Sequence, residues 1–531
     1  MPNNVKNEDN GQASECVNDS PPFFQHIRWR PDEQVDSDSG HYNQQQQQSK
    51  HPTSLQIFRL WQVFLNNVHP LVMLFHAPSV QQVILDIATD ATSVSKATGA
   101  LGFAIYLCAI ASMTDSECLE LTGESKADSL EHFSRLSHEA LFNSDCLHSN
   151  NMVVLQALTL YTLATFYMRG SPSHSEKLAA LAGRAAQLAQ ALGLHQEDRQ
   201  KDLPPFSKEM RRRLFWQVLI LDGRAAAAQR LGAGATAAGP HFHDGSWNVQ
   251  RPLNVSDSQL VPSMSKPPPE QLDGPTDMLL CSIRIEIEQS MRRLEQHQQH
   301  PSLRSPPAFG AWIEQQQQLQ QVAVVEQTEQ RIEQHLLRSC DACIPFHLLT
   351  AYQARSWLRQ LRLSVYHPRQ RGQSSLGHQP DEHERERLFS LAQQVLSYDN
   401  LVHSNPRFRR YLWLIGRDLP VDAVIVVLLE LLSKGDDGGD DADVDEGKQN
   451  VVNRAWRYII QVYEDHPVLI NAARENPLFL AIGLLTLKAW DSRTTSKSEQ
   501  MPSPSTDYDR DEPLCISRLR AQRVSASPAS S

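Results

Sequence analysis

The sequence has no excess of positive charge. Its 50 lysines and arginines are outnumbered by 61 aspartates and glutamates, so the formal net charge is -11. A protein that binds nucleic acid mainly through phosphate contacts usually carries a basic domain. The overall charge therefore argues against a chain that holds nucleic acid by bulk electrostatic attraction.

Long apolar segments are also missing. The first residues are polar and have no apolar centre, which is not the pattern of a secretory signal. The longest apolar run, from Ala100 to Met113, is shorter than the ~18–20 residues that cross a bilayer. We therefore expect no membrane segment, and this run predicts a buried helix instead.

Cysteine is scarce, and the few cysteines are scattered rather than arranged in a framework. Scattered cysteines in a chain without a signal suggest a reducing compartment, either the cytosol or the nucleus. The chain contains Cys16, Cys108, Cys118, Cys146, Cys281, Cys340, Cys343 and Cys515.

Local signatures of catalysis are absent as well. We find no phosphate-binding glycine loop, dinucleotide fingerprint, nucleophile elbow or H-E-x-x-H helix. Active sites need no local signature, so an enzyme stays open as a distant alternative. The expectation is a protein that is not an enzyme.

One pair of cysteines has a spacing that can bind metal. Cys340 and Cys343 form a C-x-x-C pair, and His347 follows four residues later. Such a pair can hold zinc or act in redox chemistry. It lies in a helical pattern without a second ligand pair, so we expect it to be incidental.

A second candidate lies in a glycine- and alanine-rich segment. His241, His243 and Asp244 form an H-x-H-D group, and imidazoles with a carboxylate suit zinc or iron. A loop with no further partner in the sequence is a poor cage for a metal. We therefore expect no metal in this chain and assign no cofactor.

Polar, low-complexity segments divide the chain. Residues 1–53 are rich in Asn, Asp, Gln, Ser and Pro, and they are predicted to be disordered. A helical domain is predicted over residues 54–490, with a proline-rich linker at 262–275 and a mobile acidic loop at 434–447. The Ser/Pro-rich tail, residues 491–531, is again predicted to be disordered.

Nearly every segment between these breaks shows the 3.6-residue period of a helix, and no convincing series of alternating strands is present. The predicted fold class is all-α, as one large bundle or two abutting lobes. The expected helices are Leu55 to Leu65, Leu101 to Met113, Asn151 to Tyr167, Ser173 to Leu192, Met278 to Leu294, Ile344 to Leu363, Leu412 to Leu432, Val451 to Val462 and Leu478 to Ala489.

The stretch "KEMRRRLFWQVLILDGR", from Lys208 to Arg224, puts three arginines ahead of a wide apolar helix face. We expect Ser207 to cap this helix and Glu209 to pair with Arg213 one turn later. In an acidic chain the arginines are predicted to pair with carboxylates rather than with DNA. Asp222 and Arg224 are expected to tie the far end of the helix to a neighbouring helix.

Five motifs in order resemble the regulatory homology domain of fungal-specific transcription factors, over roughly residues 55–490. They are "LWQVFLNNVHPLVMLFHAPSV" at the start, the "ALGLH" helix end, the arginine stretch, "RPLNVSDSQL" and the late "PLFLAIGLLTLKAW". The matching residues in the two central motifs are Ala185, Ala189, Leu192, Gly193, Leu194 and His195, then Glu209, Arg211, Arg212, Arg213, Phe215, Trp216, Asp222 and Arg224. Departures from the family pattern are Gly223, which stands between the last two, and an apparent insertion, Leu231 to Trp247.

This resemblance implies an α-helical regulatory domain in a nuclear regulator of transcription by RNA polymerase II, which controls metabolic or natural-product genes. The family also has an N-terminal binuclear zinc cluster held by six cysteines. Residues 1–53 contain only Cys16, so zinc ligands and base-reading residues cannot be assigned. The DNA-binding residues and the effector site are therefore unknown at this stage.

Two routes to DNA stay open. The protein contacts DNA directly only if a zinc cluster lies upstream of this chain; otherwise it acts through a partner regulator. Transcription machinery and a homo- or heterodimer partner are further expected contacts. A metal-binding protein or enzyme built around His241, His243, Cys340 and Cys343 is the third alternative.

Overall fold

A computed structural model describes the chain from residue 51 to residue 524, with several gaps. In the described residues the only regular structure is helical, as the sequence predicts. None of those helices combines the length and the apolar character of a membrane span. The described ranges are 51–146, 149–168, 173–233, 239–243, 245–270, 275–298, 307–366, 381–436, 446–473, 476–500 and 512–524.

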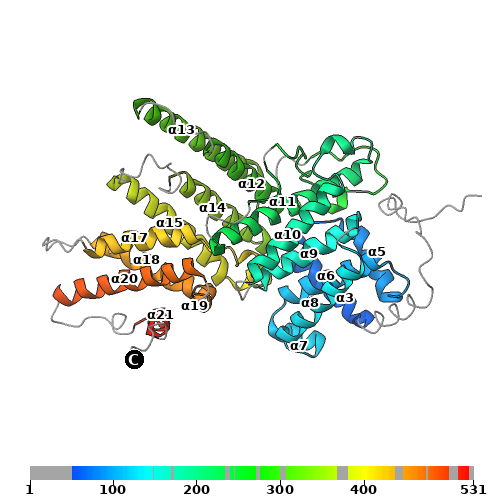
Figure 1. Ribbon diagram of the computed structural model, residues 1–531, viewed down its shortest axis with the longest axis horizontal. Coiled ribbons are helices and arrows are strands. Elements are labelled where there is room, and N and C mark those ends of the chain that lie inside the picture. The colour runs from blue at the N-terminus through cyan, green and yellow to red at the C-terminus, as the bar shows by residue number, and fades with distance from the viewer. Residues whose placement is uncertain are drawn as a thin grey trace, which may run out of the picture.

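The helices form two lobes, as Figure 1 shows, with the first half of the chain on the right and the last part on the left. Each lobe has a separate hydrophobic core. Of the two architectures that the sequence leaves open, the structure has two abutting lobes. The helices of the first lobe are α3 (Ser54–Asn67), α4 (His69–Val72), α5 (Ala77–Thr89), α6 (Lys96–Ser112), α7 (Asp115–Thr122), α8 (Lys126–Asn143), α9 (Met152–Tyr167), α10 (Ser173–Ala191) and α11 (Pro205–Ala233).

Helices α6 and α9 form the centre of the first lobe. Both are apolar on nearly all sides, and α6 packs against α3, α8 and α9. A helix without a polar face is stable only when other helices surround it. The run that the sequence predicts to be a buried helix is therefore the core of this lobe.

His51, just before α3, has its ring stacked on Phe103 of α6 with 4.2 Å between ring centroids. Burial lowers the pKa of His51 to about 4, whereas an unfolded histidine titrates near 6.5. Because the unfolded chain binds the proton first, folding stability should fall as pH drops from about 6.5 to 4. In His51→Phe, which keeps the stacking, the melting temperature should fall less over this pH range. Parallel curves for the two proteins would show that this residue does not titrate with unfolding.

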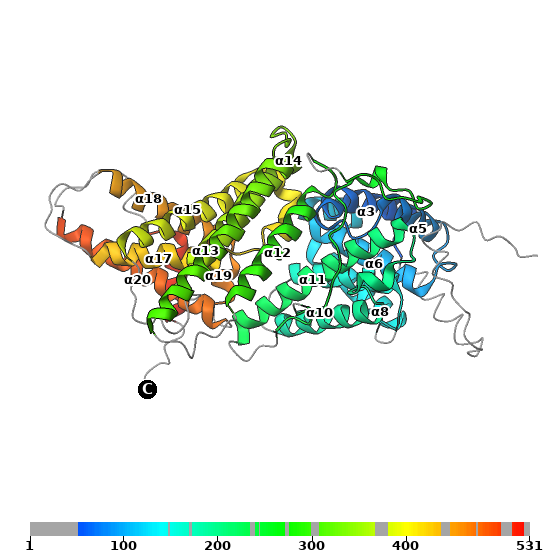
Figure 2. The same ribbon diagram turned by 90° about the horizontal axis from the view of Figure 1, so that it is seen from above.

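Three long helices lie between the lobes, as the view from above shows (Figure 2). They share a smaller core, and α13 contains the glutamine-rich stretch. Each of the three packs on the other two. They are α12 (Leu279–Gln298), α13 (Pro307–Arg331), which continues into a π-helical turn (Ile332–Leu336), and α14 (Pro345–Tyr366).

The second lobe is a bundle around the second core. Helix α15 packs against α14, α17 and α18, and α17 packs against α20. Residues 367–380 and 437–445, which include most of the predicted acidic loop, lie outside the described residues. The helices of this lobe are α15 (Glu382–Ser404), α16 (Leu412–Ile415), α17 (Val421–Asp436), α18 (Glu446–Asp465), α19 (Val468–Asn471), α20 (Pro477–Gln500) and α21 (Leu514–Val524).

The prediction of a single helix from Leu412 to Leu432 is wrong. The structure has two helices there, and the break spans Gly416 to Pro420. Proline cannot continue a helix in its interior, because it lacks the N–H and its ring clashes with the preceding turn. The apolar pattern continues on both sides of the break, which explains why the periodicity concealed it.

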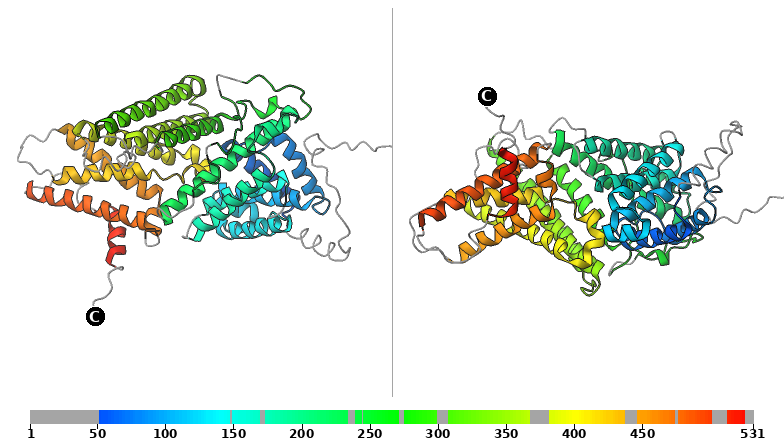
Figure 3. Two further views of the ribbon diagram at one scale, coloured as in Figure 1. Left: turned by 45° about the horizontal axis from the view of Figure 1, so that its top comes forward. Right: turned by 90° about the horizontal axis from the view of Figure 1, so that it is seen from below.

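The tail is predicted to be disordered from residue 491 onward, but the structure has helix in two parts of it. Helix α20 continues to Gln500, and α21 packs across α18, α19 and α20, as the red helix in Figure 3 shows. Cys515, Ile516 and Leu519 of α21 are buried in the second core. Three apolar side chains in a polar tail were too few to predict this docking. Residues 501–511 and 525–531 of the tail lie outside the described residues.

Ile516→Ala should destabilise the second lobe by about 2–4 kcal/mol, because it removes a fully buried side chain. Arg518→Ala, on the exposed side of the same helix, should change stability by less than about 0.5 kcal/mol. Denaturant unfolding of both variants measures the difference. Equal stability of the two variants would mean that α21 does not dock in solution.

Candidate functional site

Helix α11 carries the arginine stretch and begins earlier than expected. Its first residue is Pro205, whose fixed backbone angle and missing N–H suit the first turn of a helix. Ser207 therefore lies inside the first turn, and its predicted capping role is wrong. The amide of Lys208 donates to the carbonyl of Pro204, so the helix starts on the prolines.

Arg213 is the centre of a buried ion network. Its Nε lies 3.1 Å from Oε1 of Glu209 and its Nη1 lies 2.6 Å from Oδ1 of Asp257. The Arg213 side chain has no exposed surface, and Glu209 also accepts a hydrogen bond from the backbone N–H of Leu253. The predicted pair of Glu209 with Arg213 is confirmed. Asp257 is a partner that helix spacing could not reveal.

Asp257 connects this network to α4 and to the start of α5. Its Oδ2 accepts from the backbone N–H of Ala77 at 2.8 Å and lies 3.3 Å from Nε2 of His69, while its carbonyl lies 3.1 Å from Nε2 of His76. Burial raises the pKa of Asp257, but the His69 hydrogen bond and the charge of Arg213 outweigh it and hold the pKa well below its usual range. The network thus fastens α11, the start of α5 and the segment from Leu253 to Asp257 to one another.

The other two arginines also have internal partners. Arg212 donates from Nε to Glu197 at 3.0 Å and from Nη2 to Oε1 of Gln250 at 2.8 Å. Arg211 donates from Nη1 to the carbonyl of Leu192 at 3.2 Å. The expected carboxylate partners are confirmed for Arg212 and Arg213, and Arg211 binds a carbonyl instead. Arg212 and Arg213 are therefore neutralised inside the protein.

Trp216 fixes the segment that follows α11. Its ring is fully buried, and its Nε1 donates to the carbonyl of Gln250 at 3.0 Å. The ring meets Trp247 edge to face at 5.2 Å, and Phe215 meets Phe242 at 5.2 Å. The presumed insertion is therefore held against α11 by aromatic packing at both of these positions.

Asp222 and Arg224 lie before the end of α11, which continues to Ala233. The predicted contact with a neighbouring helix is found for Arg224, whereas Asp222 binds the presumed insertion instead. Arg224 pairs with Asp418 in the break between α16 and α17, and its guanidinium lies 5.0 Å from the ring centre of Phe166. Asp222 accepts from the backbone N–H of Phe242 at 3.1 Å and lies 2.8 Å from Nδ1 of His241. Arg224 reaches the segment next to the second lobe, whereas Asp222 reaches the presumed insertion.

A shallow cleft of about 290 Å³ opens beside Asp222 and His241. Its volume is just below the usual range for small-molecule pockets, and five of its nine lining residues are alanine or glycine. It adjoins residues outside the described ranges. The cleft is lined by Glu176, Ala179, Ala180, Asp222, Ala225, Ala226, Gln229, Gly239 and His241.

The two predicted metal candidates do not form metal-ligand groups among the described residues. His241 is bound to Asp222, and Asp244 lies outside the described ranges. His347 accepts from the backbone N–H of Asp341, and the thiol of Cys340 faces the carbonyl of Leu336. The one group of adequate geometry in the described chain is Asp399, His403 and His466, which the sequence did not suggest.

The geometry defines a class of protein: an all-helical scaffold in which the charged side chains of the central motif bind groups inside the protein. Residues 61–229 match the model of the family described as "Fungal specific transcription factor domain", so the chain carries this domain. The matched range runs from α3 to α11 and contains all six signature residues, Glu209, Arg211, Arg212, Arg213, Trp216 and Asp222.

The chain is also similar to named regulators over most of its length. It is 39% identical over 84% of its residues to the "Aurofusarin cluster transcription factor aurR2" of Gibberella zeae. It is 28% identical over 84% to the "Transcriptional regulator AacuB" of Aspergillus aculeatus, and 27% identical over 85% to the "Pyriculol/pyriculariol biosynthesis cluster transcription factor 1" of Pyricularia oryzae. The chain covers 62%, 56% and 56% of the lengths of these three relatives. Other relatives are named C6 finger domain transcription factors.

Proposed function

We propose that this chain is the regulatory part of a nuclear regulator of RNA polymerase II transcription that controls a fungal secondary-metabolite gene cluster. The observation that carries the proposal is the similarity over 84% of the chain to a cluster transcription factor. The match of residues 61–229 to the fungal-specific transcription factor domain supports it as well. On this proposal the protein is not an enzyme, and the helical domain acts by binding other macromolecules.

Contact with DNA is a separate question within this proposal. A binuclear zinc cluster needs six thiolates, and residues 1–53 supply one, Cys16. These residues do not fit the cluster, so we derive no DNA contact from them. Arg212 and Arg213 are paired with internal carboxylates, so these two arginines do not support a DNA contact.

Deletion of the gene tests the regulatory role. We expect transcripts of a contiguous set of biosynthetic genes to fall or rise together, and expression of the intact gene to restore them. A fluorescent fusion at the native locus should accumulate in the nucleus. An unchanged transcriptome under conditions in which the protein is present, with the fusion outside the nucleus, would contradict the proposal.

Mapping the 5′ end of the transcript separates the two routes to DNA. A six-cysteine cluster in frame ahead of Met1 would give direct binding through that cluster. A transcript without one would favour the alternative, in which the helical domain binds a DNA-binding regulator. Purification of the tagged protein under native conditions should then recover that regulator, and chromatin association should depend on it.

A further inference from the structure

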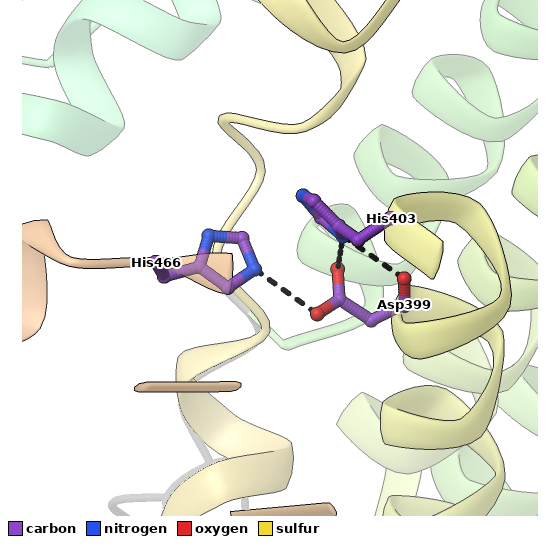
Figure 4. Close-up of side chains that lie close together, drawn as sticks. All are labelled: Asp399, His403 and His466. Atoms are coloured by element: carbon purple, nitrogen blue, oxygen red, sulfur yellow. Dashed lines mark hydrogen bonds and ion pairs between the residues drawn. The ribbon is translucent and has the colours of Figure 1, made fainter. Parts of the chain in front are cut away.

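Three side chains from distant parts of the second lobe meet at one point. Asp399 and His403 lie one turn apart on α15, and His466 reaches them from the corner between α18 and α19, as Figure 4 shows. The Nε2 of His466 is 3.0 Å from Oδ2 of Asp399, and the Nδ1 of His403 is 3.4 Å from Oδ1. One ligand atom from each residue lies within 4.8 Å of the other two.

Both ring nitrogens of His403 face carbonyl oxygens. Its Nδ1 lies 2.9 Å from the carbonyl oxygen of Asp399, and its Nε2 lies 3.4 Å from the carbonyl oxygen of Gly416. A neutral imidazole donates from one nitrogen only, so its other nitrogen would point a lone pair at an oxygen. The side chain is only 8% exposed, so bulk water does little to weaken this repulsion.

A second carboxylate adds negative charge at this point. Oδ2 of Asp465 is buried and has no hydrogen-bond partner among the described residues, while Oδ1 accepts from Gln461 at 3.2 Å. The nearby Asp418 is paired with Arg224. The cluster therefore brings two carboxylates and two imidazoles together, a set of ligand types that suits a metal cation.

A small polar cavity adjoins the cluster. Its volume is about 10 Å³, which is close to the space of a single water molecule. Asp399 and His403 form part of its wall, together with polar groups of Gln353, Ser356 and Tyr398. A ligand at the cluster could therefore keep one bound water on this side.

We propose that Asp399, His403 and His466 bind a divalent cation of the zinc type. Two imidazoles and a carboxylate are a common zinc ligand set, and a catalytic-type shell leaves a fourth position for water. Neighbouring ligand atoms in a tetrahedral zinc shell are about 3.3 Å apart. Each histidine lies at a similar distance from one oxygen of Asp399, 3.4 Å for His403 from Oδ1 and 3.0 Å for His466 from Oδ2. Bound metal would link α15 to the corner between α18 and α19. This site differs from the thiolate cluster of the family and does not depend on the proposed function.

Metal analysis of the full chain, purified without chelator, tests the site. After incubation with zinc and removal of excess, we expect about one zinc per chain and a rise in melting temperature on the order of 3 °C, both reversed by a chelator. His466→Gln and His403→Gln should lose both effects. Glutamine can still donate a hydrogen bond to Asp399, so the metal-free fold should persist.

His383→Gln is the matched control, since His383 is 99% exposed and lies at the start of the same helix. It should bind zinc as the unaltered chain does. Zinc that stays in His466→Gln at the original stoichiometry would place the metal elsewhere and overturn the proposal. Absence of both bound zinc and a thermal shift in the unaltered chain would overturn it equally.

Discussion

Replacing Arg213 by methionine is expected to lower the free energy of unfolding by about 3–5 kcal/mol. The change keeps most of the side-chain volume but removes the cation between Glu209 and Asp257, both of which are buried. Breaking a buried ion network is costly because the remaining charges lose their partner and have little contact with water. Denaturant unfolding followed by circular dichroism measures the change.

Arg212→Met on the same helix is the control. Its partner, Glu197, is 18% exposed, so water can solvate the unpaired carboxylate and the expected loss is about 1 kcal/mol. Adding Glu209→Gln to Arg213→Met should recover part of the loss, because it neutralises one unpaired carboxylate. If Arg213→Met were as stable as Arg212→Met, the buried network would contribute little to the fold.

Trp216→Ala is expected to destabilise the first lobe by about 3–5 kcal/mol. The ring is fully buried and packs against Trp247, and its indole N–H donates to the carbonyl of Gln250. Alanine leaves a cavity and leaves that carbonyl without its donor. Residues 245–250 should therefore exchange backbone hydrogens faster in the variant.

Trp216→Phe separates the two contributions. It keeps an aromatic ring but removes the indole N–H, so the loss should be smaller, about 1–2 kcal/mol. Hydrogen exchange measured by mass spectrometry should show release of residues 245–250 in the alanine variant before any change in α6. Uniform exchange across the whole first lobe would mean that Trp216 supports the entire core rather than this segment.

The predictions that local pattern could make were largely correct. The 3.6-residue period located most of the long helices, and the spacing of four residues located the pair of Glu209 with Arg213. Prediction from local pattern failed where the local signal was ambiguous. The apolar pattern concealed the break between Gly416 and Pro420, and the polar composition of the tail concealed the docking of α21.

The sequence by itself determined the helical class, the order of the family motifs and the face of α11 that is buried, because these depend on residues a few positions apart. Only the tertiary structure decided which distant groups bind to the arginines. Asp257 is 44 residues beyond Arg213, and His466 is 67 residues beyond Asp399. Such pairs leave no periodic signal, since they depend on how separate helices pack. The chemistry of both clusters therefore follows from the packing of helices that the sequence could identify only one at a time.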